Sequence, residues 1–161
     1  MNIAIYPGSF DPITNGHVDI ATRASRLFEK IIIGIFANPE KRLTFTIDER
    51  VELATRAVAH LANVEVKSYN SITVDFARQI NAKVMVRGLR MSADFEREFD
   101  MAIMNRKLSP VIDVVCLMAD LKYQFLSSSL LKEVASLNGN IRDLVPKAVA
   151  SALRRKFLIK P

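Results

Sequence analysis

The sequence predicts an α/β fold in which helices cover both faces of one five-stranded parallel sheet. Five short apolar runs alternate along the chain with segments whose apolar residues recur at helical spacing. Such alternation is typical of parallel strands joined by right-handed crossovers, which build a doubly wound sheet. The 161 residues contain no internal repeat, low-complexity tract or linker. We therefore expect a single domain over residues 1–161.

The first strand, expected at residues 3–6, leads through a turn rich in Gly and Pro into a helix whose apolar positions begin at Val18. Thr14 or Asn15 can serve as the N-cap of that helix. The start of a helix presents unpaired backbone N–H groups and the positive end of the helix dipole, and both favour an anion. The sequence therefore predicts an anion site directly after the first strand.

Within this turn, His17 is the candidate catalytic residue. A ligand phosphate can approach the backbone closely at Gly8 and Gly16, because neither residue has a Cβ. The dipole should lower the pKa of His17, and a neutral imidazole still donates a hydrogen bond to a phosphate oxygen. We expect a nucleotide phosphate site here. The alternative for His17 is a helix-capping or merely exposed side chain.

Four more strands are expected at residues 31–37, 64–67, 83–87 and 112–118. The fourth strand should break at Gly88. The fifth contains the single cysteine, Cys116, in an apolar run that should be buried. In doubly wound sheets ligands bind beyond the carboxyl ends of the strands, where the strand order reverses. The polar and basic residues that follow the strands should therefore gather at one edge of the sheet.

Helices are expected between and after these strands. Residues 46–49 form a capping-box pattern for a helix to about residue 61, and Thr73 is a candidate N-cap for the next helix. A third helix, with an apolar face that includes Phe95 and Phe99, should stop before Pro110. Serines 127–129 should cap a helix that reaches residue 137, and Pro146 suits the first turn of the last helix.

The composition limits the class of protein. Half of the residues are hydrophobic and a quarter are charged, as in ordered globular proteins. No apolar run approaches the ~20 residues needed to cross a bilayer, and no secretory leader is recognisable, so we expect no membrane partner. A lone cysteine excludes an intrachain disulfide, and apolar burial should raise the pKa of its thiol. A reducing, cytoplasmic location fits best.

The formal net charge of +6 favours polyanionic ligands. The basic residues are scattered, however, and they are not interleaved with aromatic residues. A small polyphosphate explains the clusters at residues 41–42 and 87–90 at least as well as a nucleic acid does. We therefore expect no nucleic-acid partner, and a basic nucleotide- or RNA-binding module remains the non-catalytic alternative.

Several familiar catalytic patterns are missing. The sequence has no G-x-x-x-x-G-K-[ST] and no G-x-G-x-x-G after its first strand, which argues against a P-loop kinase and a dinucleotide oxidoreductase. It has no G-x-S-x-G of a serine hydrolase and no cysteine–histidine cluster of a zinc site.

Three motifs together carry a resemblance to a known family. They are Thr-Asn-Gly-His at 14–17, Arg-Gly-Leu-Arg at 87–90 and the serine triplet at 127–129. In order and spacing the chain resembles the T/HxGH nucleotidyltransferase superfamily and, within it, the bacterial phosphopantetheine adenylyltransferases. The resemblance spans nearly the whole chain and implies a Rossmann-like fold. It also implies direct transfer of the adenylyl group of ATP to 4′-phosphopantetheine, giving dephospho-coenzyme A and pyrophosphate.

The resemblance implies roles for individual residues. The implied catalytic residues are His17, Lys41 and Arg90. The implied acceptor-binding residues are Ser9, Lys41, Thr73 and Arg87. The implied ATP-binding residues are Ser9, Phe10, His17, Gly88, Leu89, Arg90, Glu98, Tyr123, Gln124, Phe125, Leu126, Ser127, Ser128 and Ser129.

For several of these residues the sequence alone leaves a simpler role open. Lys41 lies in an expected loop and Glu98 on an expected helix, where both side chains are commonly solvated. Ser9 suits a turn, and the serine triplet suits an N-cap. Arg87 and Arg90 flank a glycine at a strand end, which favours contact with an anion or solvent.

The resemblance also implies a homohexamer and a Mg²⁺ ion that arrives with ATP and is held by phosphates and water, since no metal-ligand set is visible. Residues 69–73 lack the glycine–leucine pair expected of the pantetheine-contacting loop. Another nucleotidyltransferase of the superfamily, acting on nicotinate mononucleotide or a polyol phosphate, is the catalytic alternative.

Overall fold

Five parallel strands form one sheet at the centre of the molecule. The computed structural model describes residues 2–37, 43–90 and 92–158, except for the side chains of residues 92–94. The strands are β1 (Ile3–Gly8), β2 (Lys30–Phe36), β3 (Val64–Tyr69), β4 (Val84–Leu89) and β5 (Asp113–Met118), in the order β3-β2-β1-β4-β5. The predicted doubly wound α/β fold is confirmed. The order reverses between β1 and β4, which places the switch point there.

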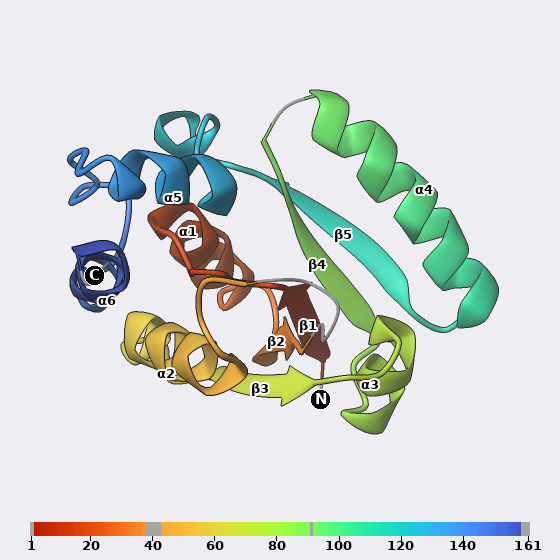
Figure 1. Ribbon diagram of the computed structural model, residues 1–161. Helices are drawn as coiled ribbons and strands as arrows, with labels where there is room; N and C mark the ends of the chain where they lie inside the picture. Colours follow the sequence, from red (N-terminus) through yellow and green to blue (C-terminus); the bar gives the residue numbers. More distant parts are fainter. Residues whose placement is uncertain (1, 38–42, 91, 159–161) are drawn as a thin grey trace.

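Two groups of helices cover the two faces of this sheet (Figure 1). One face carries α1 (Asn15–Ala24), α2 (Ile47–Val58), α5 (Ser128–Ser136) and α6 (Lys147–Leu158). The other carries α3 (Thr73–Gln79) and α4 (Ser92–Leu108), and α4 lies along β4 and β5. None of the helices in the described part of the chain is long and apolar enough to span a membrane.

The alternating side chains of the strands divide the core in two. Ala4, Ile31 and Ile33 pack toward α1 and α2, whereas Ile5 and Ile32 pack toward α3. All five of these residues are nearly or completely buried. Burial of both strand faces explains why the central strands read as continuous apolar runs rather than as alternating ones.

Helix starts near the carboxyl edge of the sheet are well capped. Thr14 and Thr46 each form a capping box, with His17 and Glu49 respectively as the reciprocal partner. Ser127 caps α5, since its hydroxyl oxygen accepts the backbone N–H of Leu130 at 3.1 Å. These caps confirm the predicted starts of three helices.

The expected N-cap role of Thr73 is wrong. The N-cap position of α3 is Ile72, which makes no side-chain capping bond. The hydroxyl of Thr73 instead lies 3.0 Å from the hydroxyl of Tyr69, at the end of β3. A side chain contact across the β3–α3 connection has therefore replaced the local cap.

The expected break at Gly88 is also wrong, because β4 continues to Leu89 and Gly88 pairs with Leu117 of β5. A Cβ at Gly88 would lie 3.2 Å from Cγ1 of Ile20. The glycine thus lets α1 pack closely on β4 instead of ending the strand. Between β5 and α5 lies the short helix η1 (Leu121–Tyr123).

The expected burial of Cys116 is wrong as well, since this residue is exposed. It lies on β5, which is an edge strand of the sheet. The two faces of this strand are only partly buried. Partial burial still raises the pKa of its thiol, as expected. The neighbouring helix α4 leaves Phe95, Phe99, Met101, Ile103, Met104 and Leu108 each 45–56 % exposed.

Candidate active site

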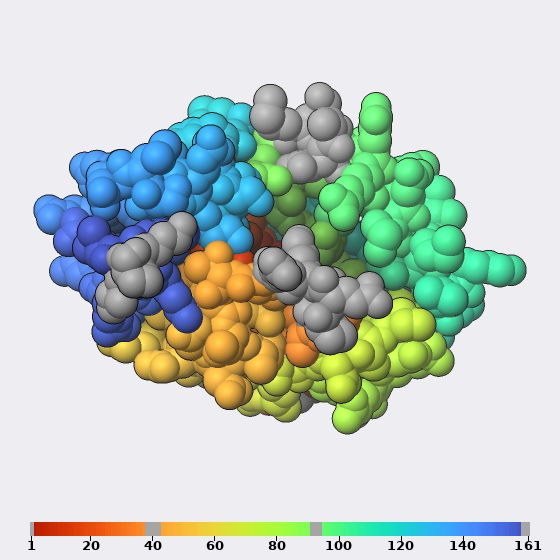
Figure 2. Space-filling model, viewed as in Figure 1, coloured from red at the N-terminus to blue at the C-terminus, as the bar shows by residue number. Residues whose placement is uncertain are grey.

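A cavity of about 360 Å³ opens at the carboxyl ends of β1 and β4, where the strand order reverses. Its walls come from the turn after β1, the first turn of α1, the end of β4, Glu98 of α4, and the segment that leads into α5. Figure 2 shows the hollow between the blue surface of α5 and the green surface of α4. Its position is the one at which doubly wound sheets bind ligands.

His17 lines this cavity and is locked in one orientation by Thr14. The backbone N–H of Thr14 donates to Nδ1 of His17 at 3.0 Å, and the backbone N–H of His17 donates to Oγ1 of Thr14 at 3.3 Å. Because Nδ1 accepts a hydrogen bond, the neutral imidazole carries its proton on Nε2. The ring therefore keeps one N–H donor for a ligand.

The pKa of His17 is lowered to about 4. Burial is the largest cause of this shift, and the positive charges of Arg90 and Arg87 also contribute to it. The predicted lowering of the His17 pKa is confirmed, but its causes are burial and the two arginines, whereas the sequence suggested the helix dipole. At neutral pH the imidazole is uncharged and acts as a hydrogen-bond donor, not as a cation.

The ring of Phe10 packs against the imidazole of His17. Phe10 adopts a positive φ of 44°, which turns its ring onto His17, with 5.1 Å between ring centroids, and onto Tyr6, with 5.3 Å. A Cβ at Gly8 would lie 3.0 Å from Cε2 of Phe10. Gly8 therefore makes room for the aromatic ring on which the imidazole rests.

Arg87 and Glu98 form a bidentate ion pair inside the cavity. Nε of Arg87 donates to Oε2 of Glu98 at 2.6 Å, Nη2 donates to Oε1 at 2.5 Å, and Nη1 donates to the carbonyl of Pro7 at 2.9 Å. Burial acts to lower the pKa of Arg87, but the hydrogen bonds and charge of Glu98 outweigh it and raise the pKa. This pair fixes the guanidinium at the end of β1.

Arg90 and the serine triplet line the opposite wall. Nη1 of Arg90 donates to the carbonyl of Leu126 at 3.0 Å, which ties the end of β4 to the segment before α5. Ser127 caps α5, and the hydroxyl of Ser128 donates to the carbonyl of Pro12 at 2.9 Å. The N-cap role that the sequence left open is therefore real for Ser127.

The cavity brings together most of the residues expected at the site. They are Ser9, Phe10, His17, Arg87, Gly88, Arg90, Glu98, Tyr123, Leu126, Ser127, Ser128 and Ser129. Leu89, Gln124, Phe125 and Thr73 are not among the residues that line it. Lys41 lies outside the described residues.

Two charged residues at the cavity were not anticipated. Asp11 and Lys132 both line it and form an ion pair of 2.6 Å. A usable signal was present for Lys132, because it lies one helical turn after Ser128 and therefore shares its face of α5. Asp11 lies in the Gly- and Pro-rich turn after the first strand, but nothing in the local sequence indicated its partner.

No group of three or more potential metal-ligating side chains occurs within the described part of the chain. The two carboxylates of the cavity, Asp11 and Glu98, already pair with Lys132 and Arg87. The wall thus combines arginine donors, a neutral imidazole N–H and the start of two helices. Such a donor set suits a polyphosphate whose charge is spread over several oxygens.

Comparisons with known proteins agree with this arrangement. Residues 5–134 match the model of the family described as cytidylyltransferase-like. A phosphopantetheine adenylyltransferase of Roseiflexus castenholzii is 50 % identical over 157 residues, with 98 % of each chain covered. The protein of the same name from Clostridium botulinum (strain Eklund 17B) is 51 % identical over 159 residues, covering 99 % of this chain and 100 % of its own.

A solved structure from Vibrio parahaemolyticus, provisionally named a nicotinate-nucleotide adenylyltransferase, superposes with a TM-score of 0.73 over 96 % of this chain and 99 % of its own. Because the sequence identity is only 17 %, this likeness shows a shared fold and no more. The family match and the full-length relatives lead to one assignment: this chain belongs to the cytidylyltransferase-like nucleotidyltransferases and, within them, to the phosphopantetheine adenylyltransferases.

Proposed function

We propose that this protein transfers the adenylyl group of ATP to 4′-phosphopantetheine by direct in-line attack, releasing pyrophosphate. The observation that carries the proposal is a neutral His17 that keeps its Nε2–H as a donor and lines a cavity together with two arginines and the start of α5. The relatives that share about half of its sequence over its full length bear the name of this activity.

The chemical step needs positioning more than it needs a reactive side chain. A phosphate oxygen of the acceptor forms a new bond to the α-phosphorus of ATP. The bond from that phosphorus to the bridging oxygen of the β-phosphate breaks, and pyrophosphate leaves with the electron pair. The attacking phosphate is already anionic, so no general base is required. Catalysis then consists of alignment and of stabilising charge on the α-phosphate oxygens.

His17 is proposed to donate its Nε2–H to an α-phosphate oxygen in the transition state. A neutral donor locked by Thr14 requires no reorganisation as charge develops. Arg90, Ser127 to Ser129 and the backbone at Gly88 are proposed to hold the triphosphate.

The acceptor phosphate is proposed to lie on Arg87 and Ser9, with Lys41 and Thr73 as further contacts. Arg87 uses three of its five N–H groups on Glu98 and Pro7, counting bonds within the described residues. Thr73 does not line the cavity, so its contact would be with the more distant pantetheine arm.

Mg²⁺ is proposed to enter with ATP. Neither cavity carboxylate offers an uncommitted oxygen pair, because Asp11 accepts bonds from Lys132 and two backbone N–H groups and Glu98 holds Arg87. Phosphate oxygens and water are therefore the proposed ligands of the ion, which is the usual arrangement for Mg²⁺ bound to a nucleotide.

The protein is proposed to assemble as a homohexamer in the cytoplasm. The exposed apolar side chains of α4 form a patch of the kind that marks contact surfaces, and a second copy of this chain is the proposed occupant. Light scattering after size-exclusion chromatography tests the assembly, and Ile103→Asp should shift it to smaller species.

A pyrophosphate-release assay with ATP and a panel of phosphorylated acceptors tests the activity. Turnover is expected with 4′-phosphopantetheine and not with nicotinate mononucleotide or glycerol 3-phosphate. Chiral ATP labelled with sulfur at the α-phosphorus tests the step itself, since a direct attack inverts that centre and a covalent intermediate would retain it. Turnover with another acceptor, or no turnover combined with salt-sensitive RNA binding, would refute the proposal.

A further inference from the structure

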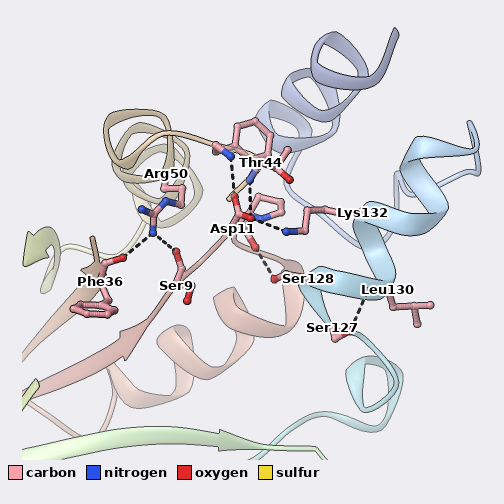
Figure 3. A network of polar contacts seen from close by, with 11 residues as sticks. Ser9, Asp11, Phe36, Thr44, Arg50, Ser127, Ser128, Leu130 and Lys132 are labelled. Carbon is pink, nitrogen blue, oxygen red and sulfur yellow. Dashed lines mark hydrogen bonds and ion pairs between the residues drawn. The ribbon is translucent and has the colours of Figure 1, made fainter. Parts of the chain in front are cut away.

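Asp11 is a buried carboxylate that joins its own turn to two other segments of the chain, so that three segments meet there (Figure 3). Its side chain is 4 % exposed. Oδ2 accepts the backbone N–H of Thr44 at 3.0 Å, and Oδ1 accepts the backbone N–H of Phe45 at 2.9 Å. Nζ of Lys132 donates to Oδ2 at 2.6 Å. Charge-assisted bonds of this length are among the stronger ones in proteins.

Each of the three segments contributes to the cavity or leads directly to it. Asp11 itself belongs to the turn that carries Ser9 and His17. Thr44 and Phe45 connect the segment containing Lys41 to the start of α2. Lys132 lies in α5, whose first turn presents the serine triplet to the cavity.

The ammonium group of Lys132 is committed to Asp11, although its side chain lines the cavity. The ammonium has three N–H groups, and its 2.6 Å bond to the buried carboxylate ties its position to the turn that contains Asp11. An effect on the reaction through that tie is indirect, whereas a direct contact of the ammonium with ATP would change the KM for ATP. A second contact runs in parallel, because the hydroxyl of Ser128 donates to the carbonyl of Pro12 at 2.9 Å.

The turn is also fixed from its other side. Nη1 of Arg50, a residue 3 % exposed, donates to the carbonyl of Ser9 at 2.8 Å and to the carbonyl of Phe36 at 2.9 Å. Figure 3 shows Arg50 and Lys132 reaching the turn from α2 and α5 respectively. The turn is thus held between two cations, of which only Lys132 belongs to a cavity wall.

We propose that Asp11 and Lys132 are positioning residues that set the distance between the triphosphate site and the acceptor site. The proposal rests on the proposed function. Through Asp11, the serines of α5 and the segment that follows Lys41 are anchored to the turn that presents His17. Direct transfer requires the reacting phosphorus and oxygen to lie about 3–3.5 Å apart, and a displacement of about 1 Å costs up to about a hundredfold in rate.

The central test is Lys132→Met, which keeps the aliphatic chain and removes the cation. We expect kcat for pyrophosphate release to fall between about tenfold and a hundredfold, while KM for ATP and for the acceptor each stay within about threefold. Lys132→Arg keeps a cation for Asp11 and should recover most of the lost kcat. The control is Lys30→Met, which removes a lysine of similar exposure (29 % against 23 %) from its ion pair with Glu65, an exposed carboxylate, at the opposite edge of the sheet.

The double variant Asp11→Asn/Lys132→Met separates positioning from the damage of an unpaired buried charge. It removes both charges, so it should fold even if Lys132→Met alone does not, and we expect its kcat to remain reduced at least tenfold. A wild-type kcat in the double variant would overturn the proposal. A rise in KM for ATP with unchanged kcat in Lys132→Met would overturn it too, because that result describes a direct ATP ligand.

Failure of the proposed function would look different. In that case the wild-type protein itself would release no pyrophosphate with 4′-phosphopantetheine. The variants would then be measured with whichever acceptor the panel reveals. A wild type that turns over normally, with Lys132→Met no slower than Lys30→Met, would refute the positioning role alone.

Discussion

The pKa of His17 gives a test of the site that needs no substrate. The chain contains two histidines, His17 and His60, so its imidazole carbon and proton signals form two sets in an NMR spectrum. The variant His60→Gln assigns them. We expect the His17 signals to stay constant from pH 8 to about pH 5 and to titrate near pH 4.

The same shift makes folding stability depend on pH in a defined direction. In the unfolded chain His17 binds a proton with an ordinary pKa of about 6.5, whereas the folded state binds it only near pH 4. The unfolded state thus holds more protons between these values, so its free energy falls relative to the folded state as the pH falls. Stability is retained above about pH 6.5 and is lost progressively down to about pH 4.

The size of this effect follows from the shift. A difference of about 2.5 pKa units corresponds to about 3 kcal/mol, and partial exposure of the ring to water reduces the expected value to about 2 kcal/mol. Urea unfolding of the wild type and of His17→Gln, each at pH 7 and pH 4.5, isolates this contribution from that of the carboxylates. The variant should lose less stability on acidification than the wild type.

Two results would refute this reasoning. One is a His17 titration midpoint between pH 6 and 7, which would mean that the ring is not buried beside Arg87 and Arg90. The other is an identical loss of stability on acidification in the wild type and in His17→Gln. Either result would also remove the neutral imidazole donor on which the proposed mechanism depends.

Three further predictions concern single residues. His17→Ala should lower kcat for pyrophosphate release by about a hundredfold or more, because it removes a transition-state donor, whereas His60→Ala should not; normal turnover by His17→Ala would exclude the mechanism. Glu98→Gln removes a negative charge that pairs with Arg87, so calorimetry should show several-fold tighter binding of 4′-phosphopantetheine, whose phosphate is proposed to lie on Arg87; weaker binding would mean that orientation of Arg87 outweighs the charge. Gly34→Ala would place a Cβ 3.0 Å from Cδ1 of Ile5 and 3.1 Å from Cε1 of Tyr69, which should cost about 1–3 kcal/mol in urea unfolding with kcat unchanged; an unaffected midpoint would show that these side chains move away freely.

Local patterns were sufficient to predict most of the fold. The capping boxes at Thr14 and Thr46 depend on residues three positions apart, so they are visible in the sequence and are present in the structure. The apolar runs at residues 3–6 and 31–37 predicted strands, and both strands, β1 and β2, lie in the interior of the sheet. These features depend on neighbours in the chain, which sequence patterns describe directly.

The wrong predictions concern contacts beyond the local helix or strand pattern. Cys116 lies in an apolar run that resembles a central strand, yet β5 is an edge strand and the cysteine is exposed. Gly88 resembles a strand breaker, but its missing Cβ makes room for Ile20 of α1. Thr73 has the side chain of a good N-cap, but its hydroxyl contacts that of Tyr69, four residues earlier. For Cys116 and Gly88 tertiary packing overrode a local preference, and for Thr73 a competing side chain at the end of β3 did.

The candidate site shows the same difference between what local sequence patterns predict and what only the folded structure determines. The sequence indicated which residues carry phosphate chemistry, but it did not indicate how their charges are balanced before a ligand binds. Arg87 faces Glu98 eleven residues away, and Lys132 faces Asp11 across 121 residues. Without these carboxylates, the positive charges of Arg87, Arg90 and Lys132 would line one small cavity and repel one another. Each carboxylate therefore stabilises the cation beside it: Glu98 fixes the direction from which Arg87 meets a phosphate, and Asp11 holds Lys132 and, through it, the position of α5. A site built in this way should lose rate, more than affinity, when either ion pair is broken.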